Sequence, residues 1–320
     1  MEGGQKNTGW HYICRKRKLY YILHNCLNSW EVKEVKKVIK ILLIFVLVLF
    51  LACLASVWLS YNYLTVSHFT VRSSKISEPF RLVLISDLHE HHFGDGNEKL
   101  AEKIRGQSPD IIIIDGDMIN GNSGNADTAV EVVQILKDIA PVYYSLGNHE
   151  YDYMEAGHEE LPEELEAAGA QVLNYESVDI EVNGNPIRLG GLYEYGFETG
   201  MQSAEEDERA VSYLEQYADT DRYLVMCAHR PESFYPWDMA DAWGIDLVLS
   251  GHLHGGQVII PGVGGLYNSL DGFFPEFDYG QYKLGDSDMI ITRGLGSNPK
   301  KLPRFNNMPE IAVVDVEVST

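Results

Sequence analysis

The sequence predicts an α/β sandwich preceded by one transmembrane helix. Three observations lead to this prediction: an uncharged apolar run near the N-terminus, a series of short apolar runs rich in β-branched residues, and helix-like segments between several of those runs. Short continuous apolar runs are typical of buried strands. Strands that alternate with helices indicate an α/β architecture.

The N-terminal apolar run, ILLIFVLVLFLACLASVWLS at residues 41–60, contains no charged residue. About 20 such residues make a helix long enough to cross roughly 30 Å of hydrocarbon. Trp58, Tyr61 and Tyr63 lie at its end, and aromatic side chains favour the membrane interface. We therefore expect a membrane anchor at residues 41–63.

Charge is distributed unevenly along the chain. Residues 1–40 carry nine Lys or Arg and three Glu, a net charge of +6, so the remaining 280 residues sum to −28 within the total of −22. Positive residues tend to stay on the cytoplasmic side of a span. The sequence thus predicts a single-pass protein of the cell membrane, with a basic cytoplasmic head at 1–40 and an extracytoplasmic body. A body this acidic repels polyanions, which argues against a nucleic-acid partner.

Three other interpretations of the apolar run are open. Cys53-Leu54-Ala55 places small residues near the spacing of a signal-peptide cleavage site. The run could instead be a buried core helix, or an anchor in the inverted orientation with the body facing the cytoplasm. The long head and the continuation of the run past residue 55 favour an anchor over a cleaved signal.

The body is expected to contain a single domain at 80–320, after a linker at 64–79. Strands are expected at 80–85, 110–114, 142–146, 223–227, 246–249 and 289–292, and helices at 126–139, 162–168 and 203–217. Asn125 is a candidate N-cap for the first of these helices, and Gly169 suits the end of the second. The Gly- and Pro-rich tail at 261–309 is expected to form long loops around the one strand near 289–292.

Residues able to bind metal lie where five of these strands end. They are Asp87, His89, Asp117, Asn148, His229, His252 and His254. The carboxyl ends of strands meet at one edge of an α/β sheet, where such folds place their sites. Imidazole, carboxylate and amide oxygen together suit Mn, Fe or Zn better than Ca or Mg. Seven ligands are too many for one tetrahedral ion but suit two ions that share a bridging carboxylate.

The ordered motifs DLH, GD, GNHE, AH and GHLH resemble those of the calcineurin-like metallophosphoesterases, over nearly all of residues 80–315. The GGQ after the last histidine resembles a bacterial membrane-associated branch of that family, as do RGLG at 293–296, Pro303-Arg304 and Pro309-Glu310. The resemblance implies a four-layer αββα metallophosphoesterase sandwich. It also implies two divalent metal ions per chain.

The resemblance assigns a role to each residue of the site. Asp87, His89 and His254 would hold the first ion, Asn148, His229 and His252 the second, Asp117 would bridge them, and His149 would be the catalytic residue beside the scissile phosphate. Two cations about 3.5 to 4 Å apart lower the pKa of a water between them, and the resulting hydroxide attacks phosphorus in line with the leaving alcohol. His149 would then donate a proton to the leaving oxygen or stabilise the charge that forms there.

Two features of the motifs lead to narrower expectations. On an extended segment, residues two apart point to the same face, so His252 and His254 could reach neighbouring ions, while the glycines around them leave room for phosphate. In several relatives the third residue after the bridging aspartate is another aspartate, which orients the counterpart of His149. Here that position is Asn120, so we expect His149 to be a weaker acid or to contact another carboxylate.

Three further residues near the motifs are not expected to be ligands. His91 and His92 are expected to be loop residues near the mouth of the cleft, and Arg230 to form a structural ion pair. The sequence as a whole predicts a membrane-anchored, dinuclear metal-dependent phosphoesterase that hydrolyses a phosphate ester or pyrophosphate, either a small molecule or a lipid or cell-envelope precursor. The alternative is a catalytically idle metal-binding scaffold or receptor with the same fold; the complete ligand set argues against it.

Overall fold

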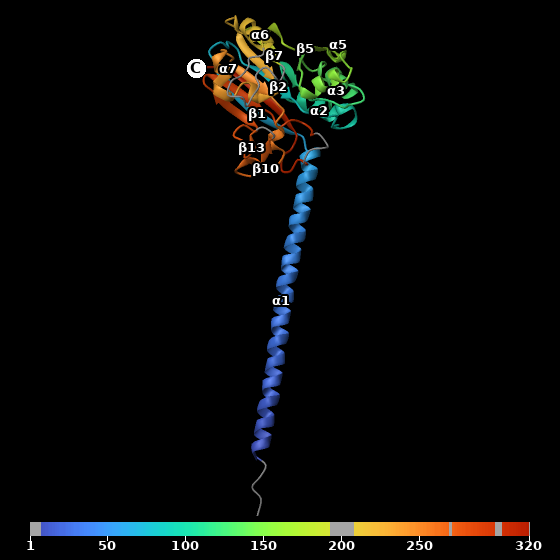
Figure 1. The fold of residues 1–320 in the computed structure, drawn as a ribbon, viewed down its shortest axis with the longest axis vertical. Coiled ribbons are helices and arrows are strands. Elements are labelled where there is room, and N and C mark those ends of the chain that lie inside the picture. The colour runs from blue at the N-terminus through green and yellow to red at the C-terminus, as the bar shows by residue number, and fades with distance from the viewer. Residues whose placement is uncertain (1–7, 193–207, 269–270, 298–302, 320) are drawn as a thin grey trace, which may run out of the picture. The chain divides into compact units, whose positions relative to one another are not determined.

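A computed structural model describes residues 8–192, 208–268, 271–297 and 303–319 (Figure 1). The chain divides into two compact units, residues 1–55 and 56–320.

The first unit is formed by helix α1 (Thr8–Asn62), whose last turns belong to the second unit. The helix begins well before the apolar run, so the described part of the basic head is helical rather than extended. The helical segment Val32–Asn62 is long and apolar enough to cross a membrane. Its most apolar 18-residue stretch is not buried by the rest of the protein. A signal sequence near the N-terminus meets the same criterion.

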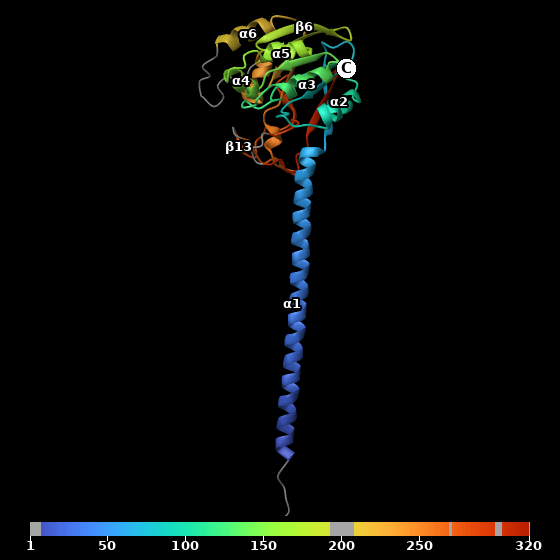
Figure 2. The ribbon, with the colours of Figure 1, turned by 90° about the vertical axis from the view of Figure 1, so that its right-hand side faces the viewer.

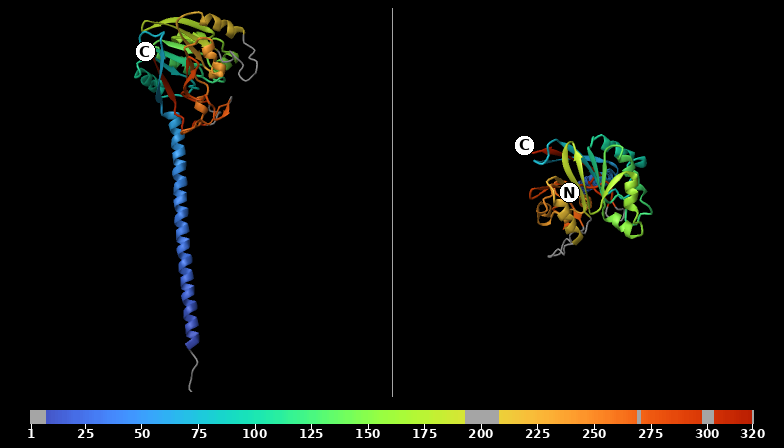
Figure 3. Two further views of the ribbon diagram at one scale, coloured as in Figure 1. Left: turned by 90° about the vertical axis from the view of Figure 1, so that its left-hand side faces the viewer. Right: turned by 90° about the horizontal axis from the view of Figure 1, so that it is seen from above.

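The second unit is the predicted four-layer αββα sandwich. One six-stranded sheet has the order β1-β16-β2-β3-β4-β5, and the other has the order β14-β15-β9-β8-β7-β6. Seen from above, the two sheets lie between the green helices on one side and the orange helices on the other (Figure 3). The strands of the first sheet are β1 (Thr65–Ser73), β2 (Phe80–Ile85), β3 (Ile111–Asp115), β4 (Val142–Ser145), β5 (Ala170–Leu173) and β16 (Glu310–Val318). Those of the second are β6 (Glu176–Val182), β7 (Asn185–Leu192), β8 (Tyr223–Ala228), β9 (Leu247–Ser250), β14 (Gly280–Leu284) and β15 (Ser287–Ile291).

The helices cover the outer faces of the two sheets. They are α2 (Glu98–Arg105), α3 (Asp127–Leu136), α4 (Asn148–Glu155), α5 (Leu161–Ala168), α6 (Glu208–Ala218) and α7 (Met239–Ala242). The candidate cap Asn125 lies one residue before the N-cap of α3, which is Ala126, although its Oδ1 still accepts the N–H of Asp127. Helix α5 ends at Gly169 as expected, with φ of 121° at that glycine. Residues 203–207 of the third expected helix lie outside the described residues.

Alternation along the strands separates three hydrophobic clusters. In β2, Leu82 and Leu84 pack between the two sheets, whereas Val83 and Ile85 pack under helices α2, α3 and α5. In β8 the alternate residue Met226 packs with α6 and α7. Because strands such as β3, β8 and β9 are buried on both faces, their sequences are continuously apolar rather than alternating. This is why the short apolar runs predicted strands correctly.

Two expectations from the sequence are wrong. The segment 64–79, expected to be a linker, contains strand β1, which pairs with β16 along nine residues. The tail contains β14 and two short hairpins in addition to the expected strand. The hairpins pair β10 (Ile259–Ile260) with β11 (Gly264–Gly265), and β12 (Tyr267–Asn268) with β13 (Gly272–Phe273). Most of these strands carry polar residues or glycines, and β10 is only two residues long, so no long apolar run indicated them.

The pairing of three strands places the end of α1 near one particular edge of the first sheet. Strand β16 is antiparallel to β2, with Ala312 opposite Leu84, so β16 begins where β2 ends. Strand β1 is parallel to β16, with Thr65 opposite Glu310. Residues 56–62 of the second unit, which come just before β1 in the chain, therefore lead into the edge of the sheet at which β2, β3 and β4 end.

Candidate metal centre

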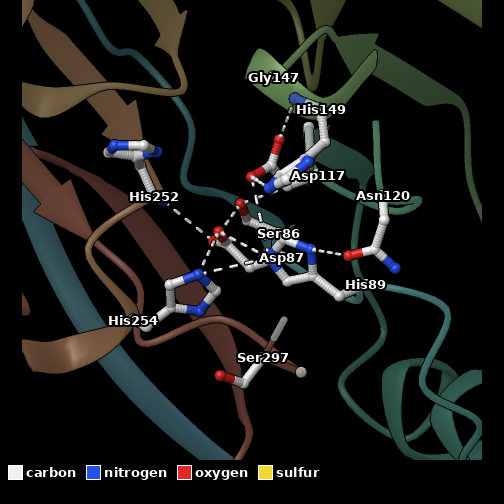
Figure 4. Close-up of polar contacts among 12 residues, drawn as sticks. Ser86, Asp87, His89, Asp117, Asn120, Gly147, His149, His252, His254 and Ser297 are labelled. Atoms are coloured by element: carbon white, nitrogen blue, oxygen red, sulfur yellow. Dashed lines mark hydrogen bonds and ion pairs between the residues drawn. The ribbon is translucent and has the colours of Figure 1, made fainter. Parts of the chain in front are cut away.

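The residues expected to bind metal lie at this same edge, and Figure 4 shows five of them, Asp87, His89, Asp117, His252 and His254. Asp87 and His89 follow β2, Asp117 follows β3, Asn148 and His149 begin α4 just after β4, His229 follows β8, and His252 and His254 follow β9. The ligand atoms form three overlapping groups, in each of which all ligand atoms lie within 4.8 Å of one another: Asp87, His89 and His254; His89, Asp117 and His149; Asp117, His229 and His252. The two sheets therefore bring together side chains that are up to 167 residues apart in sequence.

The backbone of these loops is strained. Asp87, His89, Asp117, His252 and His254 all have φ between 49° and 66°, the left-handed region that side-chain-bearing residues seldom occupy. Each such residue costs about 1–3 kcal/mol unless the surrounding structure imposes the conformation, and such residues collect at functional sites. The fold therefore maintains strain at five positions expected to be ligands.

Hydrogen bonds orient the buried imidazoles of His229 and His89. Nδ1 of His229 lies 2.6 Å from the main-chain oxygen of Asp115, which assigns a proton to Nδ1. Nδ1 of His89 lies 3.2 Å from Oδ1 of Asn120, whose Nδ2 donates to Glu90 and so fixes the amide orientation. In metal sites a histidine commonly donates its second N–H to an oxygen and leaves the other nitrogen for the ion. Both rings are held in that arrangement.

The charges of Asp117 and His229 depend on each other. Burial, the largest influence, opposes the charge of both groups. Nevertheless the imidazoles of His229 and His89 hold the pKa of Asp117 well below its ordinary value. The carboxylates of Asp117 and Asp87 likewise hold the pKa of His229 well above its ordinary value despite burial. Nε2 of His229 lies 3.2 Å from Oδ2 of Asp117. Since a metal ligand must give up its proton, an ion between these atoms would take over the role of the His229 proton.

The fit to metal ions can be tested on buried oxygens that no hydrogen bond explains. Among the described residues, Oδ1 of Asp87 and Oδ1 of Asn148 are buried and accept no hydrogen bond. Oδ2 of Asp87, in contrast, lies 2.7 Å from Oγ of Ser86 and accepts the N–H of His252 at 3.1 Å. A buried polar atom without a partner is unfavourable. Six side-chain oxygens of the described residues are in this state, and two of them, on Asp87 and Asn148, belong to expected ligands. The donor set therefore fits divalent ions.

In the described part of the chain, the side chain of Asn120 is hydrogen-bonded to His89 and Glu90 rather than to His149, unlike the pattern that the resemblance implies. The N–H of Gly121 donates to Nδ1 of His149 at 3.0 Å, so the ring proton lies on Nε2. That atom lies 3.9 Å from Oδ2 of Asp117, and the side chain remains 14% exposed. Among the described residues no carboxylate is hydrogen-bonded to this Nδ1, so the expectation of a different carboxylate partner is not met at that atom.

The geometry expected for the segment 252–254 is wrong. His252 has φ of 66°, and His254 begins a short 3-10 turn, His254–Gly256. The two histidines nevertheless reach different groups of ligands, because the strained backbone turns between them. A Cβ added to Gly251 would lie 2.0 Å from Oγ of Ser86 and 2.5 Å from Oδ2 of Asp87. That glycine is needed for the close approach of the β9 loop to the β2 loop.

Glu150 is a functional residue to which the sequence analysis gave no role. Its buried carboxylate accepts the N–H of Asp117, Met118 and Gly147 at 2.7, 2.9 and 3.0 Å, and the hydroxyl of Tyr144 at 2.8 Å. It thus joins the loop after β3 to the loop after β4. The fourth position of the GNHE motif was the available signal.

Arg304 and Asn307 form a second support that the sequence did not reveal. Asn307 donates through Nδ2 to the main-chain oxygens of His254 and Gln257, at 2.6 and 3.2 Å. The guanidinium of Arg304 is fully buried and donates to the oxygens of Gly296 and Asn307. Burial lowers the pKa of Arg304 to about 10, a value at which the group is still charged at neutral pH.

The remaining expectations concern His91, His92 and Arg230. His91 is half-buried, with its ring 4.7 Å from that of Phe93, and neither His91 nor His92 belongs to the three groups. Arg230 forms an ion pair with Glu232. These placements agree with loop residues and with a structural ion pair.

The family model of the calcineurin-like phosphoesterases matches residues 80–256. The chain belongs to this family, and it is a metal-dependent phosphoester hydrolase. Among its relatives, the uncharacterized protein YpbG of Bacillus subtilis is 27% identical over 259 residues, covering 79% of this chain and 87% of YpbG. The phosphodiesterase YaeI of Escherichia coli is 26% identical over 247 residues, covering 74% of this chain and 82% of YaeI.

Among solved structures, the phosphopantetheinyl hydrolase PptH of Mycobacterium tuberculosis superposes with a TM-score of 0.44 at 16% identity. That superposition covers 67% of this chain and 89% of PptH.

Proposed function

We propose that the chain is a membrane-anchored phosphoesterase with two divalent ions at the edge formed by β2, β3, β4, β8 and β9. Asp87, His89 and His254 would bind the first ion, and Asn148, His229 and His252 the second. The observation that carries this assignment is the position of Asp117, which shares one group of ligand atoms with His89 and another with His229 and His252. A carboxylate in that position is suited to bridge two ions.

When bound, the ion pair supplies positive charge for the phosphate oxygens and lowers the pKa of a water molecule between the ions. The chain's own residues hold the ligands in place. Glu150 fixes the backbone of Asp117, and Asn120 and the main chain of Asp115 orient His89 and His229. This preorganisation spares the site from rearranging when the substrate binds.

His149 would act on the leaving group. Its Nδ1 accepts the N–H of Gly121, so Nε2 carries the proton. This Nε2 lies 3.9 Å from Oδ2 of Asp117. From this position the Nε2–H would donate a hydrogen bond to the leaving oxygen or to a phosphate oxygen. The role is therefore stabilisation of developing charge as much as proton transfer.

We propose further that the anchor is α1 and that the substrate is a phosphate ester presented near the membrane, such as a lipid or envelope precursor. The strand order supports this, because β1 begins at the edge where β2 ends and follows α1 directly. The name of the related phosphodiesterase YaeI supports a diester. By the distribution of positive charge, the enzyme domain would lie outside the cytoplasm.

The first test uses the full-length chain in detergent, purified without chelator. Bound metals are measured by elemental analysis, and turnover of bis-p-nitrophenyl phosphate and p-nitrophenyl phosphate is compared with and without added Mn. About two ions per chain and turnover that requires Asp117 are expected for a two-metal site. Two ions without turnover in either assay would instead favour a metal-binding scaffold, and Asp117→Asn is the control for contaminating phosphatases.

The orientation has its own test. Protease is added to intact cells that express the chain, and cleavage of the domain is followed with an antibody. Cleavage is expected for an extracytoplasmic domain. Protection in intact cells, with cleavage after lysis, would contradict the proposed orientation and leave the hydrolase assignment untouched.

A further inference from the structure

Exposed apolar side chains outside α1 are concentrated in one short segment. In the described part of the chain, six large apolar side chains beyond α1 are exposed, and four of these lie at 263–274. They are Val263, Tyr267, Phe273 and Phe274, with 62, 42, 70 and 57% of their surface exposed. Scattered exposed apolar residues are normal, but a cluster indicates a contact surface. We call these four residues the apolar tip.

Backbone pairing gives the tip a defined shape. The main-chain N–H of Leu266 donates to Val258, and that of Phe274 donates to Leu266, so the two hairpins β10–β11 and β12–β13 are joined. The ring of Phe273 lies 5.2 Å from that of Tyr267 and 6.4 Å from that of Phe274. The aromatic side chains are therefore presented together rather than scattered along a loop.

The tip carries little charge. Residues 257–282 contain no Lys or Arg and three acidic residues. Asp278 is buried and accepts the N–H of Gly265 at 2.5 Å, and Asp271 accepts the hydroxyl of Tyr235 at 3.2 Å. Two of the three acidic side chains thus accept hydrogen bonds from the protein, although Asp271 and Glu276 stay exposed. A partner held by opposite charge does not fit this surface, whereas an uncharged apolar phase does.

Hydrogen bonds connect the tip to the last turns of α1 within the second unit. The N–H of Ile259 in β10 donates to the oxygen of Phe305, and Asn306 donates through Nδ2 to the oxygen of Ile259, both at 3.0 Å. The main-chain N–H of Asn306 in turn donates to Oγ of Ser56 at 2.9 Å. Two views at right angles agree that β13 lies at the end of this unit where residues 56–62 enter it (Figures 1 and 2).

The same end of the unit carries other aromatic residues. Trp58 in the last turns of α1 is 63% exposed, and Tyr63 just after it is 56% exposed. Trp and Tyr collect where a span leaves the hydrocarbon for the headgroup region. A bilayer crossed by α1 would therefore have its interface at the level of these residues, close to the tip.

We propose that the apolar tip is a second membrane contact, which inserts into the interface of the bilayer that α1 crosses. The proposal rests on the membrane anchorage put forward above. Val263, Tyr267, Phe273 and Phe274 would bury apolar surface among the lipid headgroups and upper acyl chains, as amphipathic surface elements do. The tip segment begins directly after the turn of His254, so this contact would hold the metal-centre edge at the level of lipid phosphates.

The test measures depth in the membrane directly. The full-length chain with its four native cysteines replaced by serine carries either Phe274→Cys or Val318→Cys, labelled with an environment-sensitive fluorophore. Each is reconstituted into nanodiscs of phosphatidylethanolamine and phosphatidylglycerol that contain lipids spin-labelled near the headgroup. Val318 is the matched control, because it is an exposed apolar residue at the far end of β16, eight residues from Glu310, or roughly 26 Å along a strand.

The label at position 274 is expected to shift to shorter wavelength and to be quenched by the spin-labelled lipid, and the label at 318 is expected to do neither. Equal behaviour of the two labels in chains that incorporate into nanodiscs would overturn the docking contact while leaving the anchor and the hydrolase intact. A chain that does not incorporate at all would overturn the anchor and the docking contact together.

A second variant gives a functional measurement. The double variant Phe273→Ser, Phe274→Ser is compared with the unaltered chain on soluble bis-p-nitrophenyl phosphate and on a long-chain alkyl p-nitrophenyl phosphodiester dissolved in the nanodisc. Turnover of the soluble ester is expected to be unchanged, and turnover of the bilayer ester to fall about tenfold as interfacial burial of two aromatic side chains is lost. An unchanged ratio of the two rates would overturn the role of the tip in presenting the site to lipid.

Discussion

The side-chain amide of Asn307 donates a hydrogen bond of 2.6 Å to the main-chain oxygen of His254, 53 residues earlier in the chain. The main-chain N–H of Asn307 donates to Oγ of Ser60 at 3.1 Å, and Arg304 donates to its Oδ1 at 3.1 Å. A single residue thus links the last turn of α1 to the loop of an expected metal ligand. Its side chain is hydrogen-bonded to main-chain oxygens of that loop, so its role is positioning.

The substitution Asn307→Ala is expected to weaken metal binding. It removes the hydrogen bonds to His254 and Gln257, so the strained turn that carries His254 loses its support. Loss of an outer contact of this kind lowers metal affinity by about 10–100-fold. The measurement is a Mn titration of the chelator-stripped full-length chain, followed by the unfolding temperature of the same sample.

Asn185→Ala is the matched control for that variant. Asn185 is also a fully buried asparagine, and its Oδ1 accepts the main-chain N–H of Ser77 at 2.7 Å. It begins β7, at the end of the strands opposite the metal centre. If both variants lose metal affinity equally, general destabilisation accounts for the loss and the positioning role of Asn307 is contradicted.

A methyl group at Gly251 is expected to displace Asp87. The added Cβ would lie 2.0 Å from Oγ of Ser86 and 2.5 Å from Oδ2 of Asp87, separations that no pair of atoms tolerates. Gly251→Ala should therefore lower both metal affinity and turnover by about 100-fold, as expected when a ligand is moved, while the domain still folds. The metal content of the preparation checks the loss of metal binding, and circular dichroism of the same preparation checks that the domain still folds.

Gly124→Ala provides the comparison, since a Cβ there would meet no atom within 4 Å and its backbone is not in the left-handed region. We expect its metal content to equal that of the unaltered chain. Full metal occupancy in Gly251→Ala would show that the β9 loop can move away from the β2 loop without loss of the site.

His149→Ala is expected to affect esters of weak acids more than esters of p-nitrophenol. The Nε2–H of His149 would stabilise charge on the leaving oxygen, and p-nitrophenolate needs little such help. Positioned donors of this kind contribute about 10²-fold or more to the rate. The kcat for an ester whose leaving group is an alkyl alcohol should therefore fall by about that factor, and the kcat for a p-nitrophenyl ester distinctly less. The measurement is kcat for both substrates, with exposed His68 replaced by alanine as control. A uniform loss on both substrates would point to substrate binding rather than to leaving-group stabilisation.

Strands β2, β3, β4, β8 and β9, and the loops after them that carry the site, were predictable because local chemistry determines them. The run Ile111–Ile114 is buried on both faces, which requires four apolar residues in succession, and Asp117 follows where the strand must end. The same reasoning located Asp87 and His229. Parallel strands carry their loops to one edge, so the convergence of these residues follows from the order of the strands.

What the sequence did not predict depends on contacts that are distant in the chain. Strand β1 is an edge strand of mixed polarity, and only its pairing with β16, more than 200 residues away, makes it part of the sheet. The roles of Glu150 and Asn307 depend on main-chain groups of other loops, which the residue type alone does not indicate. The left-handed backbone at His252 and His254 was missed for the same reason, since neither residue usually adopts it.

Asp115 leads to a prediction about pH. Its carboxylate is fully buried, and neither oxygen has a hydrogen-bond partner among the described residues. Burial, with the nearby charges of Asp87 and Asp117 against the opposing charge of His229, raises the pKa of Asp115 to about 8 from an ordinary value of 3.8. The folded chain therefore keeps this proton over a pH range in which the unfolded chain has lost it.

The contribution of Asp115 to stability is thus fully present below about pH 4 and declines as pH rises toward about 8, by about 1.4 kcal/mol per pH unit within that window. Asp115→Asn has no proton to lose at this position. We therefore expect the free energy of unfolding of the unaltered chain, relative to the variant, to fall as pH rises through the window. The measurement is denaturant unfolding of both chelator-stripped full-length chains across that range. Taking the difference removes the titration of His229 and of the other groups that the two chains share. A difference that does not change with pH would mean that Asp115 is ionised in the folded chain. Its two oxygens would then be bound by water or by an ion rather than by groups of the protein.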